Sequence, residues 1–198
     1  MKKVLILGVA AVQMDAIMVL KELGYEVFTC AMAKDGPGAD VADHFDNINF
    51  LDIPKVTQHI FANKIDALYS VGSDIAMPVV GKISEELSLP YFVGSNTAIK
   101  CNDKSLMRKT LGHNFPGNIP FQIIENKTDI PEISLPFIMK PSDSQGQRGI
   151  VLVDSISKYN ENFEVVKRFS RSGKVIIEKF VDGPEISVNA YIVKGRLR

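Results

Sequence analysis

Residues Leu135 to Ile150 read L-P-F-I-M-K-P-S-D-S-Q-G-Q-R-G-I, and the rest of the chain is organised around this stretch. The apolar run 137–139 leads directly into Lys140 and then into a loop of small and polar residues. Glycines let backbone N–H groups approach an anion closely, and hydroxyl, lysine and arginine side chains add donors and positive charge. The loop therefore suits a polyphosphate. A polar hairpin turn is the alternative, because the apolar run 150–153 follows at once and the spacing differs from the G-x-x-x-x-G-K-[ST] pattern.

The composition favours a globular protein with a small-molecule partner. The 198 residues include 45% hydrophobic residues, enough for one large domain or two small ones. Lys and Arg number 23, as do Asp and Glu, so the net charge of zero favours neither a nucleic acid nor an anionic membrane as the main partner. No apolar segment reaches 18 residues, and Gln13 and Asp15 interrupt the N-terminal apolar run, so neither a membrane span nor a signal peptide is expected.

The cysteines and histidines show no metal-site pattern. Cys30 and Cys101 form no C-x-x-C motif, and the three histidines lack the spacing of metal ligands. We therefore expect a reduced, cytoplasmic protein without structural zinc.

Over the first 95 residues, apolar runs of strand length alternate with segments of helical periodicity. The run Val4 to Leu7 ends at Gly8, and apolar residues then recur at helical spacing until Gly24. This alternation predicts a doubly wound, Rossmann-like parallel sheet in a domain 1–95. The further strands are expected at 25–30, 44–48, 67–71 and 91–93, a loop at 34–40, and helices at 53–63 and 78–87.

Ligands of such a sheet lie beyond the carboxyl ends of its strands. Gly8, Ser73 and Asp74 occupy such positions and are candidates for contacting a substrate. The sequence G-V-A-A-V-Q that begins at Gly8 lacks the second and third glycines of G-x-G-x-x-G, which disfavours a dinucleotide. Ser73 or Asp74 could instead cap the following helix.

The character of the sequence changes after residue 95. Residues 96–120 predict a linker region, with short helices at 97–100 and 104–111. From 121 to 198 strands outnumber helices, which predicts an α+β layer with an antiparallel sheet. Its strands are expected at 121–125, 137–140, 150–153, 174–179 and 185–193, and its helix at 158–170.

Three motifs in this order resemble the ATP-grasp superfamily: C-N-D-K-S-L-M-R-K-T-L at 101–111, F-I-M-K-P-S-D-S-Q-G-Q-R-G-I at 137–150 and V-I-I-E-K-F-V-D-G-P-E-I-S-V at 175–188. The likeness covers nearly the whole chain. It is similar in particular to the branch that contains the carbamoyl-phosphate synthase large subunit, biotin carboxylase and the amino-acid ligases. It implies a pre-ATP-grasp domain, then the small lobe of an ATP-grasp domain and its hinge, with the large lobe mostly missing.

The resemblance also implies an ATP site. Lys104 corresponds to a linker-helix lysine near the phosphates, and Lys140 to a strand lysine that reaches the α and β phosphates. The Glu178 side chain and the Lys179 carbonyl are implied for the adenine amino group. The remaining implied residues are Ser142, Ser144, Gln145, Gly146, Gln147, Arg148 and Gly149 in a flap over the phosphates, Phe180 and Val181 in the hinge, and Glu185 on the ribose hydroxyls. Taken without the resemblance, Glu178 and Glu185 could be ordinary surface acids and Lys104 a solvated charge.

One departure from the family concerns metal binding. The family's large lobe supplies the ligands of two Mg²⁺ ions and an arginine near the transferred phosphate, whereas this chain reaches Arg198 without them. We therefore expect a fragment whose Mg²⁺ ligands lie beyond Arg198, and assign no catalytic residue within it.

The resemblance implies that the parent protein is an ATP-dependent, carbamoyl-phosphate synthase-like ligase. It also implies that this protein can form a homodimer. It would use a carboxylate or bicarbonate and an amine or ammonia, through an acyl phosphate. A non-catalytic nucleotide-binding module or inactive fragment is the main alternative. A Rossmann oxidoreductase is disfavoured by the missing glycines after Gly8.

Overall fold

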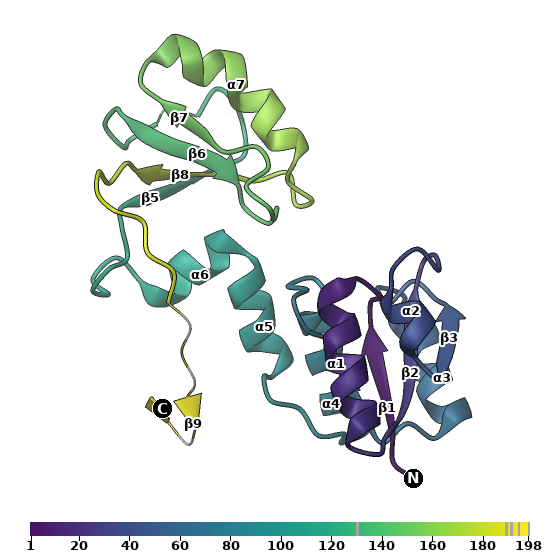
Figure 1. The fold of residues 1–198 in the computed structure, drawn as a ribbon. Coiled ribbons are helices and arrows are strands. Elements are labelled where there is room, and N and C mark those ends of the chain that lie inside the picture. Colours follow the sequence, from purple (N-terminus) through teal and green to yellow (C-terminus); the bar gives the residue numbers. More distant parts are fainter. Residues whose placement is uncertain (130, 189, 191, 194, 198) are drawn as a thin grey trace. The chain divides into compact units, whose positions relative to one another are not determined.

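Two units, Met1–Asn118 and Ile119–Arg198, make up the chain in the computed structural model (Figure 1). The structure describes residues 1–129, 131–188, 190, 192–193 and 195–197. Within these ranges, no helix combines the length and the apolar character needed to cross a membrane.

The N-terminal unit is built on a parallel sheet of four strands in the order β3-β2-β1-β4. This confirms the predicted parallel, doubly wound class. The strand expected at 91–93 does not form. That segment follows Pro90, which has no N–H to give to a sheet, and Phe92 is 81% exposed, so β4 remains the edge strand. The strands are β1 Lys3–Leu7, β2 Glu26–Ala31, β3 His44–Asn47 and β4 Ala67–Tyr69.

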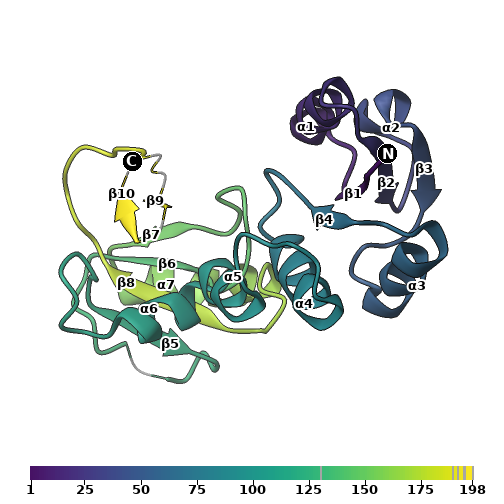
Figure 2. The same ribbon diagram turned by 90° about the horizontal axis from the view of Figure 1, so that it is seen from below.

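Helices cover both faces of this sheet because side chains alternate along β1. Val4 and Ile6 pack with Ile17 of α1 on one face. Leu5 and Leu7 pack on the other, in a core that α3 and α4 complete (Figure 2). The helices of the unit are α1 Ala11–Glu22, α2 Gly38–Val41, α3 Ile53–Asn63, α4 Met77–Leu87, α5 Ser95–Asn102 and α6 Lys104–Leu111. The α2 turn corrects the expectation of a loop through residue 40.

The C-terminal unit contains an antiparallel sheet in the order β5-β8-β6-β7, covered on one face by α7 (Figure 1). Phe137 and Met139 of β6 point into the core formed with α7. The antiparallel α+β layer was therefore predicted correctly. Its elements are β5 Phe121–Ile124, β6 Phe137–Pro141, β7 Val151–Val153, α7 Ile156–Arg168 and β8 Val175–Lys179.

The strand expected at 185–193 is wrong over most of its described length. Residues 185–188 are irregular, and Ile186 is 83% exposed, so the alternating apolar side chains of this segment have no face to pack on. Only β9, Ile192–Val193, is a strand, and it pairs with β10, Arg196–Leu197. Positions 189 and 191 of the expected strand lie outside the described residues.

Candidate nucleotide-binding site

The sheet of the C-terminal unit brings Lys140 and Glu178 together. In the antiparallel pair β6–β8, Lys140 lies opposite Ile176 and Ile138 lies opposite Glu178. Lys140 and Glu178 are therefore diagonal neighbours on one face, close enough for long side chains to meet. This is the face opposite α7, because the intervening side chain of Met139 points into the α7 core.

The two side chains form a largely buried ion pair. Lys140 Nζ lies 2.6 Å from Glu178 Oε2, and the side chains are only 17% and 4% exposed. Coulomb attraction is strong where water is excluded, and a charge left alone there is costly. The pair places a cationic donor directly beside an anionic acceptor on a sheet surface. Two residues predicted from separate motifs are thus in contact.

The loop 142–149 connects β6 to β7 and is held at both ends. At its start, the buried Ser142 donates its N–H to the Lys174 carbonyl at 3.0 Å. At its end, Gly149 adopts a left-handed φ of +72° and lies so close to Phe169 that an added Cβ would be 2.8 Å from Cδ2 of that ring. Between these ends, Ser144 and Gln145 are half-buried, while the tip is exposed. The tip consists of Gly146, Gln147 and Arg148, with left-handed φ at Gly146 and Gln147.

Asp143 is a further residue of this loop, and its position in the sequence indicates no role for it. It is 8% exposed, and its carboxylate accepts hydrogen bonds from Ser170 Oγ at 2.8 Å, Arg171 N at 2.9 Å and Ser172 N at 2.8 Å. Burial opposes ionisation, but the hydrogen bonds from Ser170, Arg171 and Ser172 outweigh it and lower the pKa of Asp143 below its ordinary value of 3.8. The signal in the sequence was an acid within a loop otherwise suited to anions.

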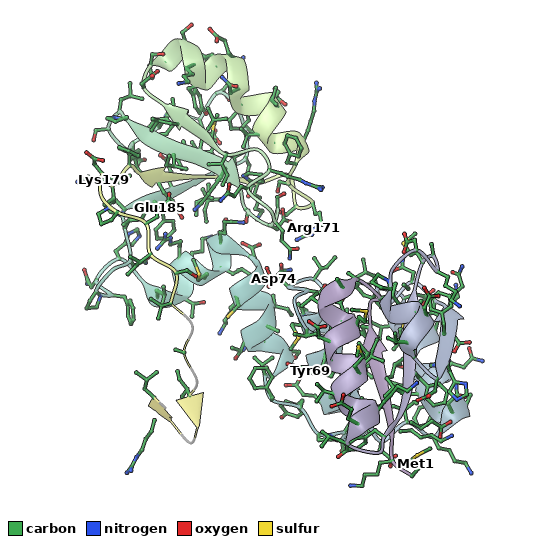
Figure 3. The ribbon with its side chains drawn as sticks, viewed as in Figure 1. Met1, Tyr69, Asp74, Arg171, Lys179 and Glu185 are labelled. Carbon is green, nitrogen blue, oxygen red and sulfur yellow. The ribbon has the colours of Figure 1, made fainter. Side chains whose placement is uncertain are left out.

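The remaining predicted hinge residues begin at Lys179, the last residue of β8. Lys179 is exposed, and its N–H donates to the Pro120 carbonyl at 2.9 Å. Phe180 is half-buried, Val181 is 61% exposed, and Glu185 lies exposed in the irregular segment that follows (Figure 3). Their roles toward adenine and ribose stay predictions.

Lys104 belongs to the N-terminal unit, where it is the first residue of α6. Asp103 caps this helix, because its side chain accepts hydrogen bonds from Ser105 N at 2.8 Å and Leu106 N at 3.1 Å. The cap fixes the backbone from which Lys104 projects. Its contact with phosphate stays a prediction.

Ser73 and Asp74 line a pocket of the N-terminal unit with a volume of about 360 Å³. Gly8 is not among its lining residues. The helix-cap alternative is not what α4 shows: the Ser73 carbonyl, rather than a side chain, accepts from Ala76 N and Met77 N, and the N-cap residue Ala76 makes no side-chain cap. The full lining is Tyr69, Ser70, Val71, Gly72, Ser73, Asp74, Met77, Phe92, Val93, Ala98, Cys101 and Asn102; Tyr69 and Asp74 are marked in Figure 3.

In the loop after β1, the side chain of Gln13 forms hydrogen bonds with the backbone. Gln13 is 4% exposed, and its Oε1 accepts from Ala10 N at 2.9 Å while its Nε2 donates to the Val71 carbonyl. An added Cβ on Gly8 would lie 3.3 Å from Gln13 Cδ. Gln13 therefore occupies the N–H of Ala10, one backbone donor at the start of α1.

Within the described ranges, no three His, Cys, Asp or Glu side chains gather in a way that could hold a metal ion. The location of Mg²⁺ ligands beyond Arg198 stays a prediction.

The Cys30 thiol is buried. Burial, with a further contribution from Asp46, raises the pKa of the Cys30 thiol to about 12, so this cysteine stays protonated and is a poor nucleophile.

Comparison with curated proteins found D-alanine--D-alanine ligases and an ATP-grasp enzyme, although no family model matches the chain. A D-alanine--D-alanine ligase of Parabacteroides distasonis is 29% identical over 75 residues, which are 38% of this chain and 22% of that protein. The ATP-grasp enzyme fsqD of Aspergillus fumigatus is 21% identical over 174 residues, which are 87% of this chain and 28% of that protein. The chain thus spans less than a third of the length of these relatives.

Solved structures share the fold over at least 91% of the chain. The L-amino acid ligase of Bacillus licheniformis aligns with a TM-score of 0.81 at 21% identity, over 100% of this chain and 48% of its own. N5-carboxyaminoimidazole synthetase of Staphylococcus aureus, solved with ADP, aligns with a TM-score of 0.75 at 20% identity, over 91% of this chain and 48% of its own. The chain spans about half the length of these proteins.

Proposed function

We propose that this chain, which belongs by its fold to the ATP-grasp superfamily, binds ATP through its C-terminal unit as part of an ATP-dependent ligase. The observation that carries the proposal is the ion pair of Lys140 and Glu178 on the face of the sheet opposite α7. The ADP bound in the S. aureus neighbour and the ligase names of the relatives support it.

The ion pair complements one edge of adenine. Adenine presents its N7 acceptor beside its N6 amino donor. Glu178 supplies an acceptor for the amino group, and Lys140, 2.6 Å away, supplies a donor for N7. An ammonium group has three donors, so Lys140 can also reach a phosphate oxygen. Guanine presents two acceptors, N7 and O6, along the same edge, and the second would face the Glu178 carboxylate.

The loop 142–149 then covers the phosphates. Its backbone N–H groups and Arg148 would neutralise negative charge and position the terminal phosphoryl group. A carboxylate oxygen of the acceptor attacks that phosphorus, which gives an acyl phosphate and ADP. An amine then attacks the acyl carbon and displaces phosphate, losing a proton. The protein's part is positioning, charge neutralisation and exclusion of water, without a protein nucleophile. Bound Mg²⁺ would supply further charge neutralisation, but the described residues contain no cluster of three His, Cys, Asp or Glu side chains that could hold it.

The acceptor is proposed to be a small amino acid, because the relatives include a D-alanine--D-alanine ligase and an L-amino acid ligase. The pocket that Ser73 and Asp74 line is the candidate for part of its binding site. Bicarbonate with ammonia, in a carbamoyl-phosphate synthase-like reaction, is the second candidate.

Calorimetric titration of ATP into the wild type and a Lys140→Met variant tests nucleotide binding. We expect wild-type binding and its loss in the variant. Lys158→Met is the matched control, because Lys158 lies on α7 and its Nζ lies 3.3 Å from the exposed Asp154. If Lys140→Met does not fold, Lys140→Met/Glu178→Gln replaces it, since that variant removes both charges. Equal ATP affinity in the wild type and either Lys140 variant would refute the proposal.

Trapping with hydroxylamine tests whether the chain is a ligase or a binding module. An acyl phosphate reacts with hydroxylamine to give a hydroxamate, which forms a coloured complex with ferric iron, so we expect product that depends on ATP, Mg²⁺ and an amino-acid mixture. ATP binding without hydroxamate would favour a non-catalytic nucleotide-binding module. Phosphate release driven by bicarbonate alone would favour the second acceptor.

A further inference from the structure

The Asp143 carboxylate sits in a loop where an acid is unexpected. If loop 142–149 holds phosphates, a carboxylate facing them would repel them. Asp143 instead directs its oxygens to Ser170, Arg171 and Ser172, in the turn 169–174 that joins α7 to β8 (Figure 3 labels Arg171). The negative charge of Asp143 is thus stabilised by hydrogen bonds from the protein itself.

The hydrogen bonds join the loop and the turn into one network. Ser170 Oγ donates to Asp143 Oδ1 and accepts from Lys174 N at 3.1 Å. Lys174 in turn accepts the N–H of Ser142 at 3.0 Å. The guanidinium group of Arg171 donates to the Asp143 carbonyl. The base of the loop is therefore fixed from both its backbone and its side chain, while the tip at 146–148 stays exposed.

We propose that Asp143 is a positioning residue that fixes the base of loop 142–149 on the turn 169–174, so that the loop N–H groups and Arg148 are held where the nucleotide phosphates bind. The inference rests on the proposed ATP site. A loop that is already placed loses less conformational entropy on binding than a loop that must order itself. Asp143 should therefore affect the phosphates and leave adenosine recognition at Lys140 and Glu178 unchanged.

Titration of ATP and adenosine into the wild type and Asp143→Asn tests this. Asn keeps the size of the side chain, but its amide NH₂ would face an N–H donor of the turn. We expect ATP affinity to fall roughly tenfold, as for loss of one hydrogen bond to a charged group, and adenosine affinity by less than about twofold. Ser170→Ala should shift the ratio in the same direction and serves if Asp143→Asn does not fold. Asp154→Asn, an exposed acid beyond β7, is the matched control and should change neither affinity.

A ratio of ATP to adenosine affinity that is the same in the wild type, Asp143→Asn and Ser170→Ala would overturn the inference while leaving the proposed function intact. Absence of wild-type ATP binding would instead refute the proposed function. In that case amide hydrogen exchange decides the anchoring: faster exchange at 142–149 and 170–174 in Asp143→Asn supports it, and unchanged exchange overturns it.

Discussion

Lys140 and Glu178 stabilise each other in a position where neither charge could remain alone. The Glu178 side chain is 4% exposed, so its carboxylate depends on the ammonium group 2.6 Å away. Nucleotide binding would exploit this arrangement, because both groups are held in place before the ligand arrives.

Removing one charge of this pair should cost more than removing both. We expect Lys140→Met to lower the free energy of unfolding by about 3 kcal/mol, because it removes the positive charge 2.6 Å from a buried carboxylate. Lys140→Met/Glu178→Gln should recover at least about half of that loss, since no buried charge remains. Urea denaturation of the two variants beside the wild type measures this difference. A double variant less stable than Lys140→Met would contradict the account of the pair.

The residues of the candidate site differ in how far the sequence could reveal them. Lys140 and Glu178 stand in recognisable motifs. Their contact can be inferred from the sequence once the antiparallel register of β6 and β8 is known. The role of Asp143 did not, because its partners lie 27–29 residues further along the chain and only the folded turn brings them near.

At the scale of elements, apolar periodicity correctly predicted the strands and helices that pack one face against a core. It wrongly predicted strands in segments that have no such face. The sheet strands and the long helices were expected from their apolar patterns. The segments 91–93 and 185–188 have strand-like composition, but Pro90 precedes the first and the apolar side chains of the second are exposed. Strand formation depends on a neighbouring strand and a face to pack on, which local sequence does not contain.

The loop 142–149 depends on a close approach at its last residue. Gly149→Ala should destabilise the protein by about 1–3 kcal/mol, because its φ is left-handed and the new Cβ would overlap Phe169. Gly173→Ala is the matched control: its φ of +70° is similar, but the nearest atom to an added Cβ is 3.9 Å away. Thermal unfolding of both variants should show the larger loss for Gly149→Ala. Equal losses would mean that the contact with Phe169 contributes nothing.

The whole molecule combines two units with different sheets and, in our proposal, different tasks. In the N-terminal unit with its parallel sheet, the side chain of Gln13 accepts a hydrogen bond from Ala10 N in the β1–α1 loop. The antiparallel sheet of the C-terminal unit leaves one face to the ion pair and the loop 142–149. The sequence could predict both sheet types, because alternating and strand-rich orders of elements differ visibly along a chain.

The central claim is that Lys140 and Glu178 recognise adenine, and a comparison of ATP with GTP tests it most directly. Both nucleotides carry the same triphosphate, so only the base distinguishes them. Calorimetric titration of each into the 198-residue chain should show ATP binding at least roughly tenfold tighter, because the O6 acceptor of guanine would face the Glu178 carboxylate. Equal affinities for ATP and GTP would contradict the claim.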